Sequence, residues 1–255
     1  MEEPSKGDPR KQAETDEMRA LLEEALEEYE VNYGSYSRHI EGPGEYEEFE
    51  PPKMYILPGF GGKEYYFTGR EIMEETISII VMTISFSIAL GRFNDWPDYL
   101  IPSFFAVFTG FFLHEMGHKI VAQNNDLWSE YRMHLKGLVL AFASSIIGLV
   151  IASPGYLDVQ GNPSDEVAGQ MSFAGPATNI MLAICAIPFF FIDGVIGFTA
   201  FLIIVVNSVL ALFNLIPFDP MDGSRIWPWS PLHYVFIAGA GSILFVTFFF
   251  ILETP

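Results

Sequence analysis

The stretch FFLHEMGH, residues 111–118, lies at the inner end of an apolar run that begins near Tyr99. Residues four apart share one face of an α-helix, so His114 and His118 can direct two imidazole nitrogens at one zinc ion. Glu115 lies beside that pair, where its carboxylate can act as a general base toward an attacking water molecule. Two histidines and a glutamate in an apolar helix are costly unless something pairs with them. The stretch therefore predicts a metal site within a membrane helix; the alternative is ordinary polar groups at the membrane surface.

The charges of the chain are unevenly distributed. Half of its 255 residues are hydrophobic, which is more than a soluble domain with this many charges normally has. Residues 1–75 hold 20 of the 32 Asp and Glu and 8 of the 13 Lys and Arg, and so carry −12 of the net charge of −19. We expect a polar acidic region, residues 1–70, followed by a membrane-embedded domain, residues 71–255. The acidic balance argues against nucleic acid as a partner, because phosphate binding needs clustered Lys and Arg.

The N-terminal region has three recognisable parts. Residues 16–30 place apolar side chains at helical spacing opposite a face of glutamates, which predicts an amphipathic helix. Residues 31–53 are rich in Gly, Pro and Glu and are typical of a linker. Residues 54–57 and 64–68 are short β-prone runs on either side of a Pro-Gly-rich turn, which predicts a β-hairpin next to the membrane.

Six apolar runs follow, at residues 76–91, 99–113, 138–152, 171–192, 194–218 and 232–252. A helix needs about 20 apolar residues to cross a bilayer. The run 138–152 is shorter, is interrupted by serines and a glycine, and ends at a Pro-Gly pair. The run 99–113 makes roughly 22 Å of helix, so His114 should lie inside a hydrocarbon core of about 30 Å.

A catalytic zinc needs a third protein ligand, with one position left open. The other histidines, His39, His134 and His233, lie in the linker, in a polar loop and at the start of the last run, where solvated or interfacial roles are favoured. The segment NLIPFDPMDG, residues 214–223, contains two aspartates and is broken by prolines and a glycine. Such broken backbone occurs at membrane depth only where it lines protein or a water-filled cavity. Asp219 and Asp222 are therefore the candidates, and spacing alone leaves both open.

Topology constrains this pairing. The histidine pair closes one span and the aspartates follow another, so an even number of crossings must separate them. Three apolar runs lie between them, and 138–152 is the one expected not to cross. We predict that it forms a re-entrant or in-plane hairpin. The loop 119–136 carries more Lys and Arg than the loop 91–98, which places the metal end toward the cytoplasm by the positive-inside tendency.

Three motifs together resemble the site-2 protease family of intramembrane zinc metalloproteases. They are HEMGH at residues 114–118, AGPATN at 174–179 and NLIPFDPMDG at 214–223, with Met221 where that family usually has leucine. The resemblance covers about residues 70–252. The chain departs from many members of the family in having no inserted PDZ-like domain, and its acidic N-terminal segment lies outside the family core.

The resemblance implies roles for six residues. His114, His118 and Asp222 would bind zinc, Glu115 would be the general base, and Asn179 and Asn214 would hold the substrate backbone or the developing oxyanion. A donor aimed at an oxyanion lowers the barrier by about 3–4 kcal/mol. The alternative for Asn179 is interhelical hydrogen bonding next to a close packing point at Gly175 and Pro176.

The sequence thus predicts an all-α multi-pass membrane protein with about five transmembrane helices, a re-entrant or in-plane hairpin and the acidic N-terminal region. By the resemblance it is an intramembrane zinc metalloendopeptidase of the cell membrane. It would cut within or near the transmembrane helices of membrane-protein substrates in the lipid bilayer. The rival interpretation is a catalytically silent, metal-binding membrane scaffold of the same fold. A metalloprotease with a downstream glutamate as third ligand is disfavoured, because no Glu after His118 lies suitably in a membrane helix.

Overall fold

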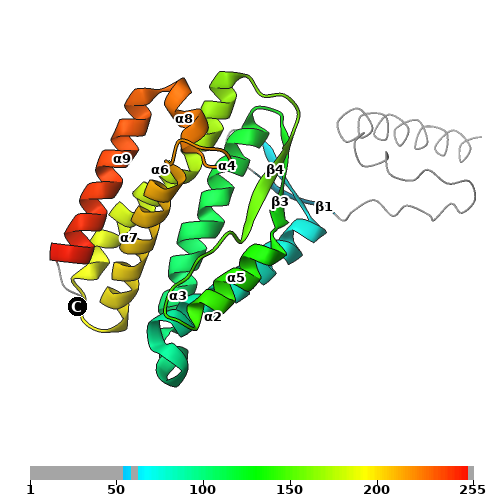
Figure 1. Ribbon diagram of the computed structural model, residues 1–255. Helices are drawn as coiled ribbons and strands as arrows, with labels where there is room; N and C mark the ends of the chain where they lie inside the picture. Colours follow the sequence, from blue (N-terminus) through cyan, green and yellow to red (C-terminus); the bar gives the residue numbers. More distant parts are fainter. Residues whose placement is uncertain (1–53, 59–62, 252–255) are drawn as a thin grey trace, which may run out of the picture. The chain divides into compact units, whose positions relative to one another are not determined.

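The computed structural model describes residues 54–58 and 63–251, which belong to one compact unit, Pro52–Pro255 (Figure 1). The helix predicted at 16–30 and the linker at 31–53 lie outside the described residues, so the division at residue 70 stays a prediction. Within the described residues, five helices are long and apolar enough to cross a membrane: Gly69–Gly91, Trp96–Asn124, Asp165–Phe190, Val195–Asn214 and Pro231–Phe250. The prediction of a helical, multi-pass membrane protein is confirmed.

The predicted β-hairpin is present. β1 (Met54–Pro58) and β2 (Glu64–Thr68) pair antiparallel, and β2 continues directly into α2 (Gly69–Asp95). The Thr68 side chain caps α2 by accepting a hydrogen bond from the Glu71 backbone N–H. The helix therefore begins seven residues before the apolar run at 76–91, and its first turns bury acidic side chains. Hydropathy places the start of this span too late, because it does not reveal the partners of those acids.

The second span contains the HEMGH motif. It runs through a short 3-10 turn at Trp96–Tyr99, α3 (Leu100–Val107), a π-helical turn at Phe108–Phe112 and α4 (Leu113–Asn124). His114 lies ten residues before the C-terminal end of α4, which places it about 15 Å inside the span.

The run 138–152 forms a hairpin whose helix is too short to cross a membrane, as predicted. α5 (Leu135–Ser145) spans about 16 Å, roughly half of a hydrocarbon core, and the chain returns in extended form. Its two ends meet where the His134 N–H donates to the Pro154 carbonyl at 2.8 Å. The flanking strands β3 (Trp128–Met133) and β4 (Gly155–Gln160) pair antiparallel beside α4, while α5 lies along α2 (Figure 1). The sequence does not predict this second sheet.

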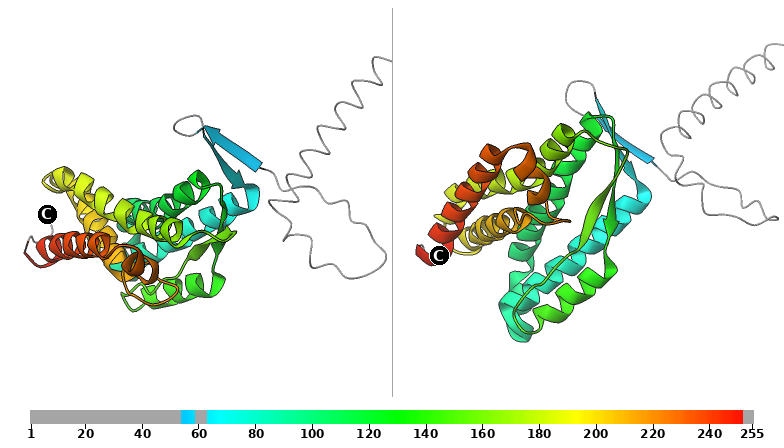
Figure 2. Two further views of the ribbon diagram at one scale, coloured as in Figure 1. Left: turned by 90° about the horizontal axis from the view of Figure 1, so that it is seen from above. Right: turned by 45° about the horizontal axis from the view of Figure 1, so that its top comes forward.

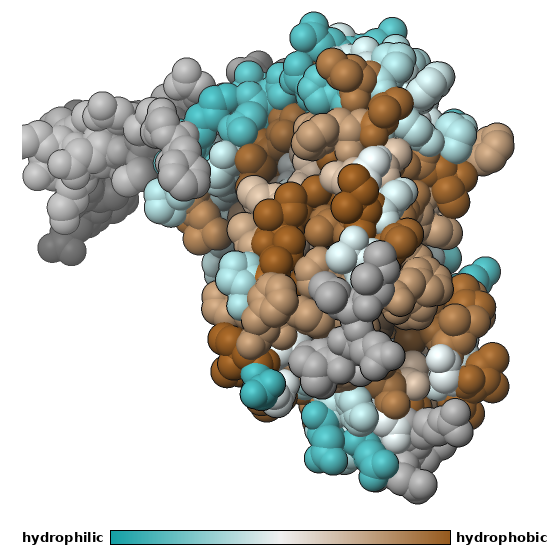
Figure 3. Space-filling view, turned by 90° about the vertical axis from the view of Figure 1, so that its left-hand side faces the viewer, coloured by the Kyte–Doolittle hydropathy of each residue, from teal (hydrophilic) through white to brown (hydrophobic). Residues whose placement is uncertain are grey.

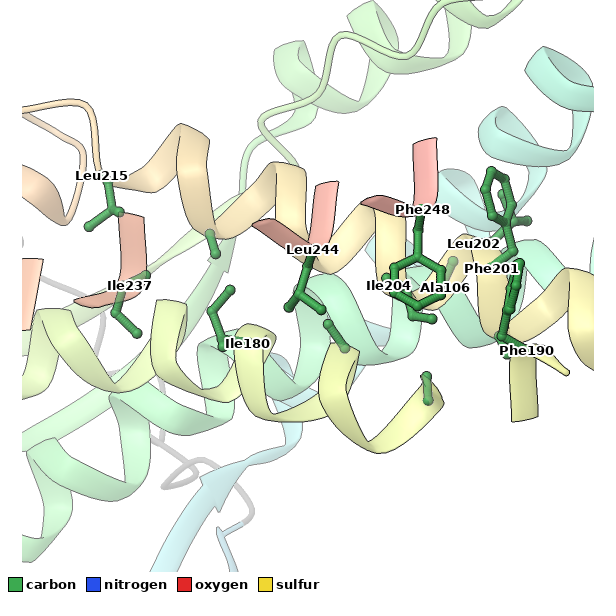
Figure 4. Packing of buried hydrophobic residues seen from close by; sticks show 14 of the residues in the cluster. Ala106, Ile180, Phe190, Phe201, Leu202, Ile204, Leu215, Ile237, Leu244 and Phe248 are labelled. Atoms are coloured by element: carbon green, nitrogen blue, oxygen red, sulfur yellow. The ribbon is translucent and has the colours of Figure 1, made fainter. Parts of the chain in front are cut away.

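The remaining spans form the main packing core. α6 (Asp165–Phe190) packs against α7 (Val195–Asn214), and α9 (Pro231–Val246), which continues into a π-helical turn at Thr247–Ile251, packs against both (Figure 2). Their buried contacts combine small and large apolar side chains, including Ile180, Phe190, Phe201 and Ile204 (Figure 4). Small residues let membrane helices approach closely where apolar burial itself gives little driving force.

The outer surface has the polarity expected of a bilayer protein. Apolar residues predominate across the middle of the face in Figure 3, and hydrophilic residues gather at its two ends. Large apolar side chains of α9 are exposed, among them Leu232, Phe236 and Ile243. A soluble monomer rarely exposes so continuous an apolar surface, so this face suits contact with lipid.

Candidate metal centre

The two motif histidines meet as their helical spacing requires. The Nε2 atoms of His114 and His118 lie 3.0 Å apart, and both residues are buried. The Nδ1 of His118 bonds the Met171 carbonyl at 2.7 Å, and the Nδ1 of His114 bonds the Asn179 side-chain oxygen. Carbonyl oxygens only accept, so each Nδ1 carries the hydrogen and each Nε2 presents a lone pair. Two lone pairs at this distance repel each other unless a cation lies between them.

Asp222 completes the group. It lies between α7 and α8 (Gly223–Trp229), where the chain leaves the helix after Asn214. Its Oδ2 is 3.5 Å from the His114 Nε2 and 3.4 Å from the His118 Nε2. Asp222 thus offers a carboxylate oxygen as the third candidate ligand.

The other candidate aspartate points elsewhere. Asp219 is exposed, and its Oδ1 accepts a hydrogen bond from the Ser224 hydroxyl at 3.2 Å. Among the described residues, the ligand atoms of His114, His118 and Asp222 all lie within 4.8 Å of one another. The structure therefore brings Asp222, and not Asp219, to the histidine pair.

The spacing of the three donor atoms suits a tetrahedral zinc site. Bonds of about 2.0–2.1 Å at tetrahedral angles separate ligand atoms by roughly 3.3 Å, and the observed separations are 3.0, 3.4 and 3.5 Å. Two imidazoles and one carboxylate are also the donor types that zinc hydrolases use, with the fourth position left open. The residues present could hold zinc without rearrangement of the backbone.

Two glycines allow the histidines to approach α6 closely. A Cβ at Gly175 would lie 2.4 Å from the His118 Nε2 and 2.7 Å from the His114 Cε1. A Cβ at Gly117 would lie 2.9 Å from the Ala174 carbonyl oxygen. Gly117 lets the backbones of α4 and α6 approach, and Gly175 leaves the space that the imidazoles occupy. The glycine of AGPATN therefore has a steric reason to lie opposite HEMGH.

Asn179 is fully buried and engaged on both sides of its amide. Its oxygen accepts from His114, and its nitrogen donates to the Gly110 carbonyl and to the Asn207 side-chain oxygen, each at 3.0 Å. Gly110 lies in the π-helical turn, a feature that often marks functional sites. Asn207 in turn donates to the Thr109 hydroxyl at 3.0 Å. A chain of polar contacts thus connects the centre of α7 to the His114 ring.

The sequence does not single out Asn207. The available signal is its position as a polar amide in the apolar run 194–218, and a polar side chain inside a membrane span marks function or interhelical bonding. A single sequence does not reveal which helix Asn207 contacts. The packing of α7 against α3 and α6 decides that.

Glu115 and Asn214 lie beside this group on the wall of one cavity. The cavity has a volume of about 640 Å³ and is lined by the three candidate ligands, by Glu115 and Asn214, and by residues of β4. The Nδ2 of Asn214 donates to the Leu210 carbonyl at 3.0 Å, which leaves its second N–H and its oxygen for other contacts. His134, expected from its sequence context to be solvated, also lines this cavity.

Fold and site together define a multi-pass membrane protein with a candidate His-His-Asp metal centre whose two histidines lie inside a spanning helix. Comparison with known proteins narrows this class. Over 188 residues, 68% of this chain, it is 30% identical to a protein of Methanocaldococcus jannaschii named "Putative zinc metalloprotease", of which it covers 91%. The chain belongs to the same family as this zinc metalloprotease. No protein-family model and no solved structure matches it.

Proposed function

We propose that the protein is an intramembrane zinc metalloendopeptidase of the site-2 protease type, which cuts membrane-protein substrates in or near their transmembrane helices. One observation carries the proposal: three zinc-type ligands meet beside Glu115, on the wall of a cavity between apolar spans. The name of the archaeal relative supports a zinc metalloprotease. The spanning helices support the finer assignment to membrane substrates.

Zinc held by His114, His118 and Asp222 would polarise the scissile carbonyl and would lower the pKa of the attacking water. Glu115 takes the proton of that water and passes it to the leaving amine. Asn214, with a free amide N–H at the cavity wall, donates to the developing oxyanion or the substrate backbone. Asn179 acts through His114: it fixes the tautomer and the ring orientation rather than touching the substrate.

The residues that line the cavity support an unwound peptide as the substrate. Its wall combines apolar side chains of the spans, such as Phe111 and Phe213, with Tyr156 and Leu157 of the extended strand β4. A helical substrate has its carbonyls hydrogen-bonded internally, so it must unwind before a carbonyl can reach the ligand group. Helix-breaking residues near the cut site would lower the cost of that step.

We further propose that the protein resides in the cell membrane with the ligand group toward the cytoplasmic side. The polar segments that follow the span with the HEMGH motif carry Arg132 and Lys136, and positive charge favours the cytoplasm. Labelling of single cysteines placed on either side of the membrane tests this orientation. The native Cys185 is exposed and would first be replaced by Ser. Labelling of the α4–β3 loop only from outside the cell would contradict the proposal.

Comparison of the wild type with Glu115→Gln tests the activity. Both proteins are purified in detergent, their zinc content is measured, and both are incubated with a panel of membrane-helix substrates with and without helix-breaking residues. The proposal expects equal zinc and cleavage by the wild type alone. Equal cleavage by both would refute the mechanism, and absence of cleavage by zinc-loaded wild type would favour the metal-binding scaffold.

Replacement of each aspartate tests the ligand set. Asp222→Ala should abolish stoichiometric zinc binding, since it removes the one anionic ligand. Asp219→Ala is the matched control, because Asp219 is exposed and its side chain bonds Ser224 rather than the histidine pair. Loss of zinc in the Asp219 variant, or its retention in the Asp222 variant, would contradict the assignment.

A further inference from the structure

A second acidic side chain lines a small cavity together with Glu115 and has no part in the mechanism above. Glu75 is in the second turn of α2 and is 6% exposed. Its Oε1 has no hydrogen-bond partner among the described residues. A buried polar atom without a partner costs about 1–3 kcal/mol, so this oxygen calls for an explanation.

The Lys119 ammonium does not bond this oxygen. The Lys119 ammonium, 1% exposed, is 2.9 Å from the Glu71 Oε1 and donates to the Ser129 carbonyl at 2.5 Å. Glu71 also accepts from the Tyr131 backbone N–H at 3.0 Å. This network fixes β3 against α2 and α4. The Glu75 oxygen lies outside it.

Glu75 and Glu115 line the same small cavity. It has a volume of about 20 Å³, and both carboxyl groups line it together with Ser78 and Tyr131. Its other walls are apolar side chains of α2 and of the second span. A cavity must offer roughly 10–15 Å³ and two to four polar partners to hold a water molecule. This cavity therefore has room for one.

The polar groups of the cavity are arranged to accept and donate. The Tyr131 hydroxyl donates to the Ser78 Oγ at 3.0 Å, and the Ser78 hydroxyl donates to the Glu74 carbonyl at 2.9 Å. The Tyr131 oxygen consequently keeps a lone pair that can accept a hydrogen bond, and Tyr131 lines the cavity together with Glu75 and Glu115. A water molecule here can donate to two of these oxygens.

We propose that Glu75 holds an internal water molecule against Glu115 and thereby orients the Glu115 carboxyl toward the ligand group. Glu75 is then a positioning residue, acting from a different helix through one water. The inference rests on the proposed function only for its effect on cleavage. The water site itself stands on the cavity and on the unpartnered oxygen.

The structural test does not depend on activity. Crystal structures of the wild type, Glu75→Gln and Glu75→Leu, at a resolution that shows ordered water, should contain a water molecule between residues 75 and 115 in the first two proteins. The Glu75→Leu variant should lack it, because leucine offers no hydrogen bond. A dry cavity in the wild type would overturn the proposal.

The kinetic test uses the same variants with a cleavable membrane-helix substrate. Glu75→Leu should lower kcat about tenfold with unchanged KM and zinc content, as loss of a partner that orients an active-site group does. Glu75→Gln should stay within about twofold of wild type, because the amide still bonds water. Thr76→Leu, a neighbouring exposed position on α2, is the control and should leave kcat unchanged.

These outcomes separate the inference from the proposed function. If the wild type cleaves, Glu115→Gln does not, and Glu75→Leu matches the wild type, the positioning role fails while the protease stands. If the wild type does not cleave at all, the protease proposal fails and the crystal structures still decide the water site. Thermal unfolding in detergent checks that Glu75→Leu is folded. A lowered kcat that comes with loss of bound zinc or of the folded state would assign Glu75 a structural role instead.

Discussion

Substitution of Gly175 by alanine tests the geometry of the ligand group with a single methyl group. The added Cβ would lie 2.4 Å from the His118 Nε2, 2.5 Å from its Cε1 and 2.7 Å from the His114 Cε1, where ordinary contacts begin at 3.4 Å. The His118 ring must therefore retreat by about 1 Å to restore normal contact.

Neither imidazole can retreat freely. The ring of His118 is tied to the Met171 carbonyl and that of His114 to Asn179, so movement breaks the contacts that orient the Nε2 atoms. Zinc sites tolerate deviations of only about 0.2 Å in ligand distance. We expect Gly175→Ala to lose stoichiometric zinc.

The assay is metal content after purification and dialysis, measured together with thermal unfolding in detergent. Gly239→Ala is the matched control, because Gly239 is also inside a membrane helix and a methyl group added there would meet no described atom within 4 Å. The control should keep full zinc and gain slightly in stability from better helix propensity. If Gly175→Ala binds zinc as the wild type does, the deduced arrangement of the two histidines is incorrect.

Three further outcomes follow from the contacts of the site and its surroundings. Asn207→Leu should weaken zinc binding roughly tenfold, because Asn179 loses the partner that holds it against the ligand histidine; competition with a chromogenic chelator measures it. Lys119→Met should lower the free energy of unfolding by about 3–5 kcal/mol, because it leaves Glu71 as an uncompensated buried charge. Chelation should lower the unfolding temperature of the wild type, since zinc binds only the folded protein, and should leave Asp222→Ala unchanged.

Each of these outcomes has its own control. Ser208→Ala removes a hydroxyl that bonds only the Ile204 carbonyl of its own helix, so this variant should keep the zinc affinity of wild type. If Ser208→Ala loses as much zinc affinity as Asn207→Leu, the loss does not depend on the hydrogen bond between Asn207 and Asn179. The double variant Lys119→Met, Glu71→Gln should recover part of the lost stability. If Lys119→Met alone is as stable as wild type, the ion pair of Lys119 and Glu71 is not buried in solution. Equal chelator shifts in wild type and Asp222→Ala would place the metal elsewhere.

Several features could not be predicted from the sequence, for identifiable reasons. β3 and β4 pair across the whole re-entrant segment, and such pairing of distant strands leaves no local pattern to detect. Hydropathy places Glu71 and Glu75 before the first span, because their charges exclude them from an apolar run. Only the approach of Lys119, 48 positions later, makes burial of Glu71 tolerable.

The sequence by itself determined the membrane class, the spans, the non-crossing hairpin and the histidine pair. These depend on local periodicity, on run length and on the parity of crossings, which can be read along the chain. Only the tertiary structure showed that Asp222 rather than Asp219 lies at the histidine pair, that Asn179 bonds His114, and that Glu75 and Glu115 line the same cavity. Those choices depend on which faces of helices meet, and helix contact is fixed by packing at glycines and by buried hydrogen bonds rather than by hydropathy.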